Sequence, residues 1–280
     1  TVSIVISSFQ GKNADIIATH RVTAAMIVPV MLAAMIESLG SHTEWSATLA
    51  KVSTGGEAVP PAVAAAVASA WPSAGLHNQY GPTETTIYST IHDYDPATGR
   101  IAIGKPVAGI RAYVLDDRLG LVPDGVAGEL YLGGDQVARG YSSQTVTTAA
   151  RFVADPFGPA GSRLYRTGDT VRWSGGVLEY LGRKDFQIKL RGQRTELGEI
   201  ETVLVSAPGV RYAAAAVAST ETGAQHLVAY VSGSSLDMEA VKTVASEKLA
   251  AFMVPTVWNE LAEIPLNSSG KVDRNALPAP

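Results

Sequence analysis

The segment Gly182–Glu201, GRKDFQIKLRGQRTELGEIE, most constrains the fold, because a strand pattern changes into a helix pattern within it. Apolar and polar side chains alternate over residues 186–191, which indicates a strand with one apolar face and one basic-polar face. The polar residues 182–185 in front of it are typical of a joint between two bodies of unequal size. We therefore expect a larger domain at 1–184 and a smaller one at 185–280.

The second half of this segment predicts a helix. Gly192 breaks the alternation, and a helical pattern begins near Thr195. Glu196 and Glu199 would lie in the first turn, where carboxylates complement the positive end of the helix dipole. The apolar residues at helical spacing that should face a core are Leu197, Ile200, Leu204 and Val205.

The composition excludes several classes of protein. The chain has 280 residues, 46% of them hydrophobic, and its net charge of −4 gives no basic field for nucleic acid. The absence of cysteine excludes disulfides and thiol nucleophiles, and fits a cytoplasmic protein. The longest apolar run, Ala24–Ile36, contains Pro29 and is shorter than the roughly 18 residues of a membrane helix. The beginning, TVSIVISS, is typical of a strand in mid-fold rather than a signal peptide.

The pattern along the chain predicts a mixed α/β fold. Strand and helix patterns alternate up to Tyr80, and the clearest helices fall at 30–38 and 60–70. Short strands split by glycines follow, including separate ones at 164–165 and 171–173. They predict a strand-rich, barrel-like subdomain at about 100–180. After residue 185, helices at 195–206 and 237–252 among four strands predict a small α+β domain.

The segment Asn78–Thr86, NQYGPTETT, gathers several groups that could bind a nucleotide. Tyr80 could stack on a base, and the hydroxyls of Thr83 and Thr85 could donate to phosphate oxygens. Glu84 could bind Mg²⁺, a hard cation that prefers oxygen ligands. The same residues also fit a strand followed by a proline turn and a capped helix, and their chemistry alone leaves both interpretations open.

Two shorter segments have similar alternatives. In residues 53–57, STGGE, the adjacent Gly55 and Gly56 would let a flat ligand approach the backbone closely, or would form a plain turn. In residues 165–169, YRTGD, Asp169 could bind a ribose diol or cap its own turn.

Lys271 lies among small residues in NSSGKVDR. This loop could carry one ammonium group to developing phosphate and carboxylate charge, or it could simply hold a solvated surface lysine. The surrounding residues do not meet the P-loop pattern GxxxxGK[ST], and the chain has no GxGxxG, HExxH or G-x-S-x-G motif.

The order of six motifs resembles one family: STGGEA, NQYGPTETT, GELYLGGDQVARGY, YRTGDTVRW, GRKDFQIKLRGQRTELGEIE and NSSGKVDR. Over nearly its whole length the chain resembles the adenylation domains of nonribosomal peptide synthetases. These domains share the adenylate-forming superfamily with acyl-CoA synthetases and luciferases. The resemblance implies the C-terminal portion of the large core domain, followed by a small mobile lid domain.

The resemblance also implies a two-step ligase reaction. An amino acid would be activated by ATP as an aminoacyl-adenylate, and then transferred to the phosphopantetheine thiol of a carrier protein. The implied cofactors are ATP and Mg²⁺. The implied partners are a carrier protein domain and a neighbouring condensation domain, with no nucleic acid and no membrane. The protein would act mainly through positioning and charge stabilisation.

Roles of individual residues follow from the resemblance, position by position. Lys271, Glu84 and Thr83 would be catalytic, and Glu84 would ligate the Mg²⁺. Asp185 would be the hinge, and Lys189 would lie on the face used for thioester formation. The nucleotide site would comprise Gly55, Gly56, Glu57, Asn78, Tyr80, Asp169, Tyr180 and Arg183. The surviving lining of the substrate pocket would be Met26, Ser53, Gly55, Gln79, Ile87 and Tyr88.

The chain also departs from the family pattern. The phosphate loop and the motif whose Asp grips an amino group would precede Thr1. Ser53 and Gln79 favour a polar or mid-sized amino acid. The alternatives are an acyl-CoA or aryl-acid ligase of the same superfamily, or a catalytically incomplete fragment that serves only as an interaction platform.

Overall fold

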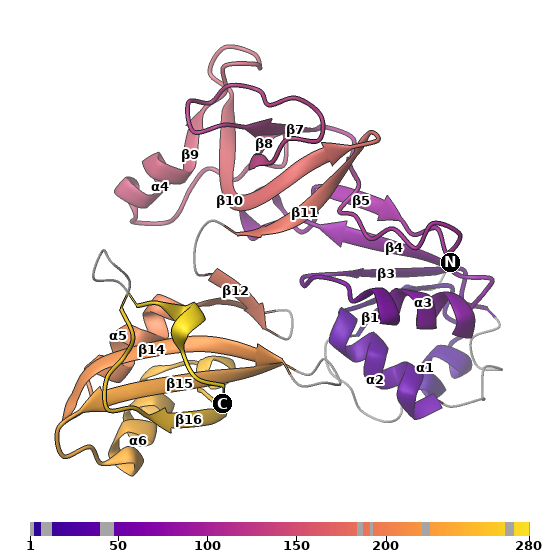
Figure 1. The fold of residues 1–280 in the computed structure, drawn as a ribbon. Coiled ribbons are helices and arrows are strands. Elements are labelled where there is room, and N and C mark those ends of the chain that lie inside the picture. The colour runs from indigo at the N-terminus through magenta and orange to yellow at the C-terminus, as the bar shows by residue number, and fades with distance from the viewer. Residues whose placement is uncertain are drawn as a thin grey trace. The chain divides into compact units, whose positions relative to one another are not determined.

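The computed structural model describes residues 3–6, 13–39, 48–183, 187–190, 193–219, 225–266 and 272–279. Within it the chain separates into two compact units, residues 1–185 and 186–280, which are treated one at a time below. Both combine helices and sheets (Figure 1), so the mixed α/β class predicted from the sequence is confirmed. No helix of the described ranges has the length and apolar character needed to cross a membrane.

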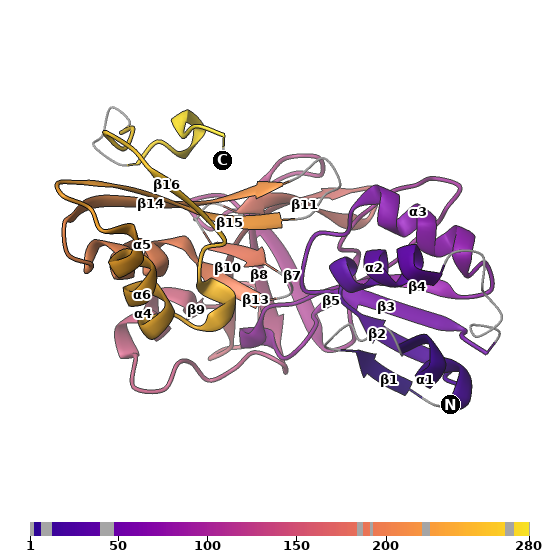
Figure 2. The same cartoon turned by 90° about the horizontal axis from the view of Figure 1, so that it is seen from below.

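The first unit begins with a six-stranded sheet whose strands follow the order of the chain (Figures 1 and 2). Its first four strands are parallel, and the last two add in antiparallel fashion. Parallel strands end at the same edge of a sheet, so residues that follow them gather there. The strands are β1 (Ser3–Ile6), β2 (Ala24–Ile27), β3 (Lys51–Gly55), β4 (Gly75–Tyr80), β5 (Thr90–Asp93) and β6 (Lys105–Pro106).

Three helices connect the parallel strands and share one hydrophobic core with them. They are α1 (Asn13–Thr19), α2 (Pro29–Leu39) and α3 (Pro61–Ala70). The predicted helices at 30–38 and 60–70 are therefore confirmed. Leu32, Val52 and Val67, from α2, β3 and α3, are each completely buried in this core. This packing fixes the direction of β3 and β4, whose last residues carry much of the predicted site.

The second part of this unit is an antiparallel sheet in the order β11-β10-β8-β7, with β9 paired to β10. The strands are β7 (Ile110–Leu115), β8 (Gly128–Gly134), β9 (Phe152–Ala154), β10 (Arg163–Ser174) and β11 (Val177–Arg183), and α4 (Thr145–Arg151) precedes β9. The prediction of separate strands at 164–165 and 171–173 is wrong, because β10 is one strand of 12 residues. A register shift between Arg166 and Thr170 accommodates the glycine that suggested a break.

The second unit begins with a hairpin of β12 (Gln187–Leu190) and β13 (Gln193–Glu196), followed by α5 (Leu197–Val205). The predicted helix start near Thr195 is therefore wrong. Thr195 pairs with Ile188, so its backbone belongs to the strand ladder and the helix begins only after it. Glu199 does lie in the first turn of α5, as predicted, whereas Glu196 is the residue before the helix.

The remaining sheet of this unit is buried on both faces. It consists of β14 (Val210–Ser219), β15 (Gln225–Gly233) and β16 (Val257–Glu260). Ala213 and Ala215 lie in the core with α5 and α6 (Met238–Lys248), whereas Ala214 lies in the opposite core with Ile264. The helix predicted at 237–252 ends at Lys248, and a 3-10 turn at Ala251–Met253 follows.

Candidate active site

The best-defined polar cluster of the first unit joins the end of β4 to β10 and β11. The Tyr80 hydroxyl donates a hydrogen bond to the Asp169 carboxylate. The other oxygen of that carboxylate accepts a hydrogen bond from Arg183 at 2.5 Å, and Arg183 also donates to the Thr167 carbonyl at 3.0 Å. Asp169 faces Arg183 across the β10–β11 ladder, and only 3% of Asp169 is exposed. Asp169, predicted to bind the ribose, and Arg183, predicted to assist it, are therefore neighbours.

Tyr80 acts in this cluster as a hydrogen-bond donor. Burial, and secondarily the negative charge of Asp169, raise the pKa of Tyr80 well above its ordinary value of 10.0. Its hydroxyl therefore keeps its proton at neutral pH. The ring packs in the core with Ile103 and Leu178, and the residue is 6% exposed. The predicted stacking of Tyr80 on a base stays a prediction.

A bulge in β10 supports Asp169. Gly168 has a φ of +78°, which favours glycine, and its N–H donates to the Glu129 carboxylate at 3.2 Å. Glu129 is 2% exposed and also accepts two hydrogen bonds from Arg166, at 2.8 and 3.0 Å. The Asp169 N–H donates to the Thr167 hydroxyl at 3.0 Å. These contacts fix the backbone on both sides of the bulge.

Gly55 and Gly56, at the end of β3, are glycines for two different structural reasons. A Cβ at Gly55 would come within 2.2 Å of the Gln79 carbonyl oxygen, because β3 and β4 pair closely there. Gly56 has a φ of +87° and is exposed. Asn78, predicted to lie near the base, donates from its side-chain amide to the Ala102 carbonyl at 2.7 Å. Glu57, which follows the pair, is half-buried.

Four of the predicted substrate-pocket residues lie on the adjacent strands β2, β3 and β4, namely Met26, Ser53, Gly55 and Gln79. Met26 pairs with Ser53 in the β2–β3 ladder, and the Gln79 amide nitrogen donates to the Ser53 hydroxyl at 3.4 Å. The Gln79 amide oxygen is buried, and no described residue donates to it. Ile87 and Tyr88 lie on the turn after β4, where Ile87 is 71% exposed and Tyr88 is half-buried.

Glu84 lies in a 3-10 turn at Thr83–Thr85 and is 7% exposed, whereas Thr83 is exposed. The carboxylate of Glu84 accepts a hydrogen bond from the Tyr141 hydroxyl at 2.5 Å. Among the described residues, no three His, Asp or Glu side chains form a group that could hold a metal ion. A single carboxylate still fits Mg²⁺, which proteins often hold through one or two carboxylates together with substrate phosphates.

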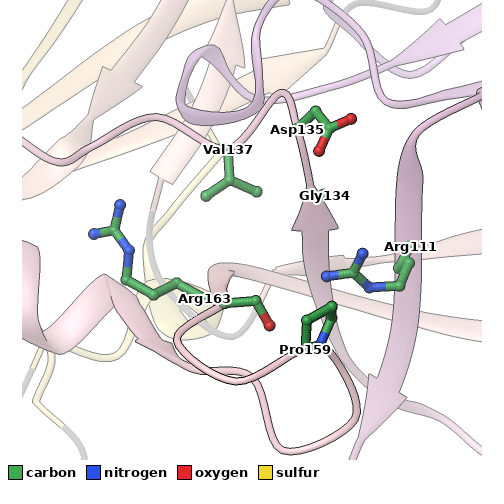
Figure 3. A pocket seen from close by; sticks show the side chains of 7 residues that line it. Arg111, Gly134, Asp135, Val137, Pro159 and Arg163 are labelled. Atoms are coloured by element: carbon green, nitrogen blue, oxygen red, sulfur yellow. The ribbon is translucent and has the colours of Figure 1, made fainter.

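A separate pocket of about 220 Å³ lies on the strand-rich sheet (Figure 3). None of the residues predicted for the nucleotide or the substrate lines it. The guanidinium groups of Arg111 and Arg163 lie on opposite sides of it. Arg111 donates to the buried Asp155 at 2.9 Å, and Arg163 donates to the carbonyls of Ala138 and Arg139. Both arginines therefore have structural partners, and we assign no ligand to this pocket.

The family resemblance also implies roles for four further residues. Tyr180 lies in β11 and is 39% exposed. Lys189 is described only as a position of β12. Asp185 and Lys271 lie outside the described residues. Their roles stay predictions.

Sequence reasoning missed Tyr141 and Glu129, although both belong to GELYLGGDQVARGY. Glu129 carried a usable signal, since it is the single charge in an otherwise apolar or glycine-containing strand, and such a charge needs a buried partner. Tyr141 carried no comparable signal, because its contact with Glu84 spans 57 positions of the chain.

The comparisons with solved structures agree with this architecture. A nonribosomal peptide synthetase protein that contains adenylation and PCP domains, bound to a vinylsulfonamide inhibitor, is 27% identical with a TM-score of 0.84, covering 95% of this chain and 46% of that one. The Vibrio cholerae adenylation domain AlmE, in complex with glycyl-adenosine-5'-phosphate, is 28% identical with a TM-score of 0.80, covering 92% of this chain and 50% of that one. The fold is that of adenylation domains.

The family match is equally direct. Residues 3–142 match the AMP-binding enzyme family, and residues 199–271 match the AMP-binding enzyme C-terminal domain. The chain belongs to the AMP-binding enzyme family.

Curated relatives are much longer proteins. One plipastatin synthase polypeptide of Bacillus subtilis is 46% identical over 271 residues, which cover 93% of this chain and 10% of the relative. Phosphinothricin tripeptide synthetase PhsB of Streptomyces viridochromogenes is 45% identical over 265 residues, which cover 92% of this chain and 22% of the relative. The chain thus spans between about a tenth and a fifth of these two relatives.

Proposed function

We propose that this chain serves an ATP-dependent ligase that activates an amino acid as an aminoacyl-adenylate and passes it to the phosphopantetheine thiol of a carrier protein. One observation carries the proposal. Tyr80 ends β4 with a hydrogen bond to Asp169, and the turn that follows the same strand carries Glu84. The carboxylate proposed to bind the ribose thus contacts the last residue of β4, and the carboxylate proposed to bind a cation lies in the turn that follows β4.

The nucleotide roles follow from this arrangement. The ionised Asp169, held by Arg183 and Tyr80, would accept hydrogen bonds from the ribose diol. Glu84 would ligate a Mg²⁺ ion, which would neutralise phosphate charge when bound. The exposed Thr83 would donate to a phosphate oxygen. The residues proposed to surround the base are Gly55, Gly56, Glu57, Asn78 and Tyr180.

The substrate is proposed to be an amino acid. The names of the curated relatives, among them a plipastatin synthase and a tripeptide synthetase, support this class. The structural neighbour AlmE holds a glycyl-adenylate, which combines an amino acid with AMP. Ser53 and the buried amide oxygen of Gln79, to which no described residue donates, would favour a substrate side chain that can donate a hydrogen bond.

The acceptor is proposed to be a carrier domain, with a condensation domain as a further neighbour. Support comes from the structural relative that contains both adenylation and PCP domains. The division of the chain after Asp185 supports a domain joint there, with Asp185 as its hinge. In the proposed cycle Lys271 acts in adenylation, and Lys189 on β12 acts in thioester formation.

Pyrophosphate exchange tests the proposal. The full-length protein is mixed with ATP, labelled pyrophosphate and single candidate acids, and label in ATP is counted. We expect exchange with one amino acid or a small related set. Exchange only with a fatty or aryl acid would instead support an acyl-CoA or aryl-acid ligase. Absence of exchange with every acid, together with absence of ATP binding, would leave an interaction platform as the function.

A further inference from the structure

We propose that Tyr141 is a positioning residue, which holds the Glu84 carboxylate in the orientation needed to ligate Mg²⁺. The inference rests on the proposed function, because it concerns the cation that accompanies ATP. Its starting point is the 2.5 Å hydrogen bond from the Tyr141 hydroxyl to Oε1 of Glu84. A charge-assisted bond of this kind is both strong and directional.

Glu84 lies in a short turn that is contacted by a neighbouring segment of the chain. It is a 3-10 turn of three residues with no side-chain cap. The Glu84 carbonyl accepts a hydrogen bond from the Ala138 N–H at 2.8 Å, which ties the backbone of the turn to residues 138–141. Tyr141 then reaches the side chain from the same segment. The segment 138–141 thus contacts both the backbone and the carboxylate of Glu84.

The segment 138–141 has supports that are independent of Glu84. Arg163 donates to the carbonyls of Arg139 and Ala138, at 2.8 and 3.2 Å. The Tyr141 N–H donates to the Thr148 hydroxyl at 2.9 Å. Tyr141 is therefore placed by β10 and α4 before it acts on the carboxylate, as preorganised support for a site requires.

The groups around the Tyr141 ring restrict the position of its hydroxyl, which donates to Glu84. The ring lies edge-on to Phe152, with the two centroids 5.5 Å apart, and its hydroxyl is 3.5 Å from that of Tyr165. These contacts hold the hydroxyl in place as a hydrogen-bond donor to the carboxylate.

The test separates metal binding from nucleotide binding. ATP affinity of the full-length protein is measured by calorimetry with saturating Mg²⁺ and again with EDTA, and the ratio of the two constants is the metal effect. The variants are Tyr141→Phe, Glu84→Gln and the double variant. Tyr113→Phe is the matched control, because it removes a tyrosine hydroxyl from β7, where the ring contacts Phe157 and not Glu84. The melting temperature of each variant is recorded.

We expect Tyr141→Phe to reduce the metal effect on the order of tenfold, as loss of an outer-shell partner does at other metal sites, with the EDTA constant unchanged. Glu84→Gln should abolish the metal effect, and adding Tyr141→Phe to it should change nothing more. Tyr113→Phe should match the wild type.

An unchanged metal effect in Tyr141→Phe, alongside its loss in Glu84→Gln, would overturn the positioning role and leave the proposed function intact. Equal weakening of ATP with Mg²⁺ and with EDTA would show a merely structural role and would also overturn it. No metal effect in the wild type would refute the assignment of Glu84 itself, and with it the inference.

Discussion

The Tyr80 hydroxyl donates a hydrogen bond to the Asp169 carboxylate, although 89 positions separate the two residues in the chain. This contact joins the six-stranded sheet to the antiparallel sheet within the first unit. Since Tyr80 stays protonated and Asp169 is also paired with Arg183, the carboxylate is held in a fixed direction from both sides.

The first prediction concerns the support of Asp169 by Glu129. Glu129→Gln keeps the shape of the side chain but removes the charge that holds Arg166 and accepts from Gly168. We expect the free energy of unfolding to fall by about 2–3 kcal/mol and ATP affinity to fall several-fold. Thermal unfolding and calorimetric ATP titration measure the two effects.

A matched control exists in the same sheet. Glu179 is also an arginine-paired carboxylate, but it bonds to Arg100 and Arg172 and not to the bulge. Glu179→Gln should lower stability and leave ATP affinity unchanged. If both variants weaken ATP binding equally, the bulge has no special connection with the nucleotide site.

The second prediction is a pH dependence at Glu179. The hydrogen bonds from Arg172 and Arg100 outweigh burial and lower the pKa of Glu179 below its ordinary value of 4.5. Because the folded-state pKa is the lower one, the stabilisation is fully present above pH 4.5 and is lost as the pH falls through the folded-state pKa. Glu179→Gln should thus cost about 1 kcal/mol at pH 7. If the free energies of unfolding of the wild type and of Glu179→Gln differ by the same amount as the pH is lowered, the prediction is contradicted.

The third prediction compares two glycines with left-handed backbones. Gly104 has a φ of +83°, and a Cβ there would come within 1.8 Å of the Ile91 carbonyl oxygen. Gly99 has a φ of +63° but open space around its Cβ direction. Gly99→Ala should cost about 1–2 kcal/mol from backbone strain alone. Gly104→Ala should lower the melting temperature much more, and equal melting temperatures would show that β5 can move away.

The fourth prediction concerns the proposed domain rotation. Lys271→Ala in the full-length protein should abolish pyrophosphate exchange but spare transfer of the acyl group from preformed adenylate to the carrier thiol. The reason is that the lysine would serve only the orientation in which phosphate charge develops. Single-turnover measurements of each half-reaction provide the comparison. Equal loss in both half-reactions would argue against two orientations.

The success of sequence reasoning depended on how local each feature is. Helices α2 and α3 were predicted because their apolar patterns are decided within a few residues. Strand β13 was missed because QRTE has no apolar alternation, and its pairing with β12 decides its conformation. The continuity of β10 was missed because a glycine at a bulge has the same sequence signal as a glycine at a break.

In the candidate site, too, some features could be predicted from the sequence and others could not. Asp169, Arg183 and Glu84 could be named because the segments that contain them resemble motifs of the adenylation-domain family. The burial of the Tyr80 ring, and the contact of Tyr141 with Glu84, come from packing between distant segments. No pattern within one segment could have indicated them.

The central claim is that the Asp169 carboxylate, oriented by Tyr80 and Arg183, is the ribose-binding group of an ATP site. Its most direct test is equilibrium binding of ATP to the Asp169→Asn variant of the full-length protein. Replacing a charged acceptor by a neutral one should weaken ATP binding roughly 10- to 100-fold, because hydrogen bonds to charged groups are the stronger ones. Unchanged ATP affinity in a variant that melts at the wild-type temperature would contradict the claim.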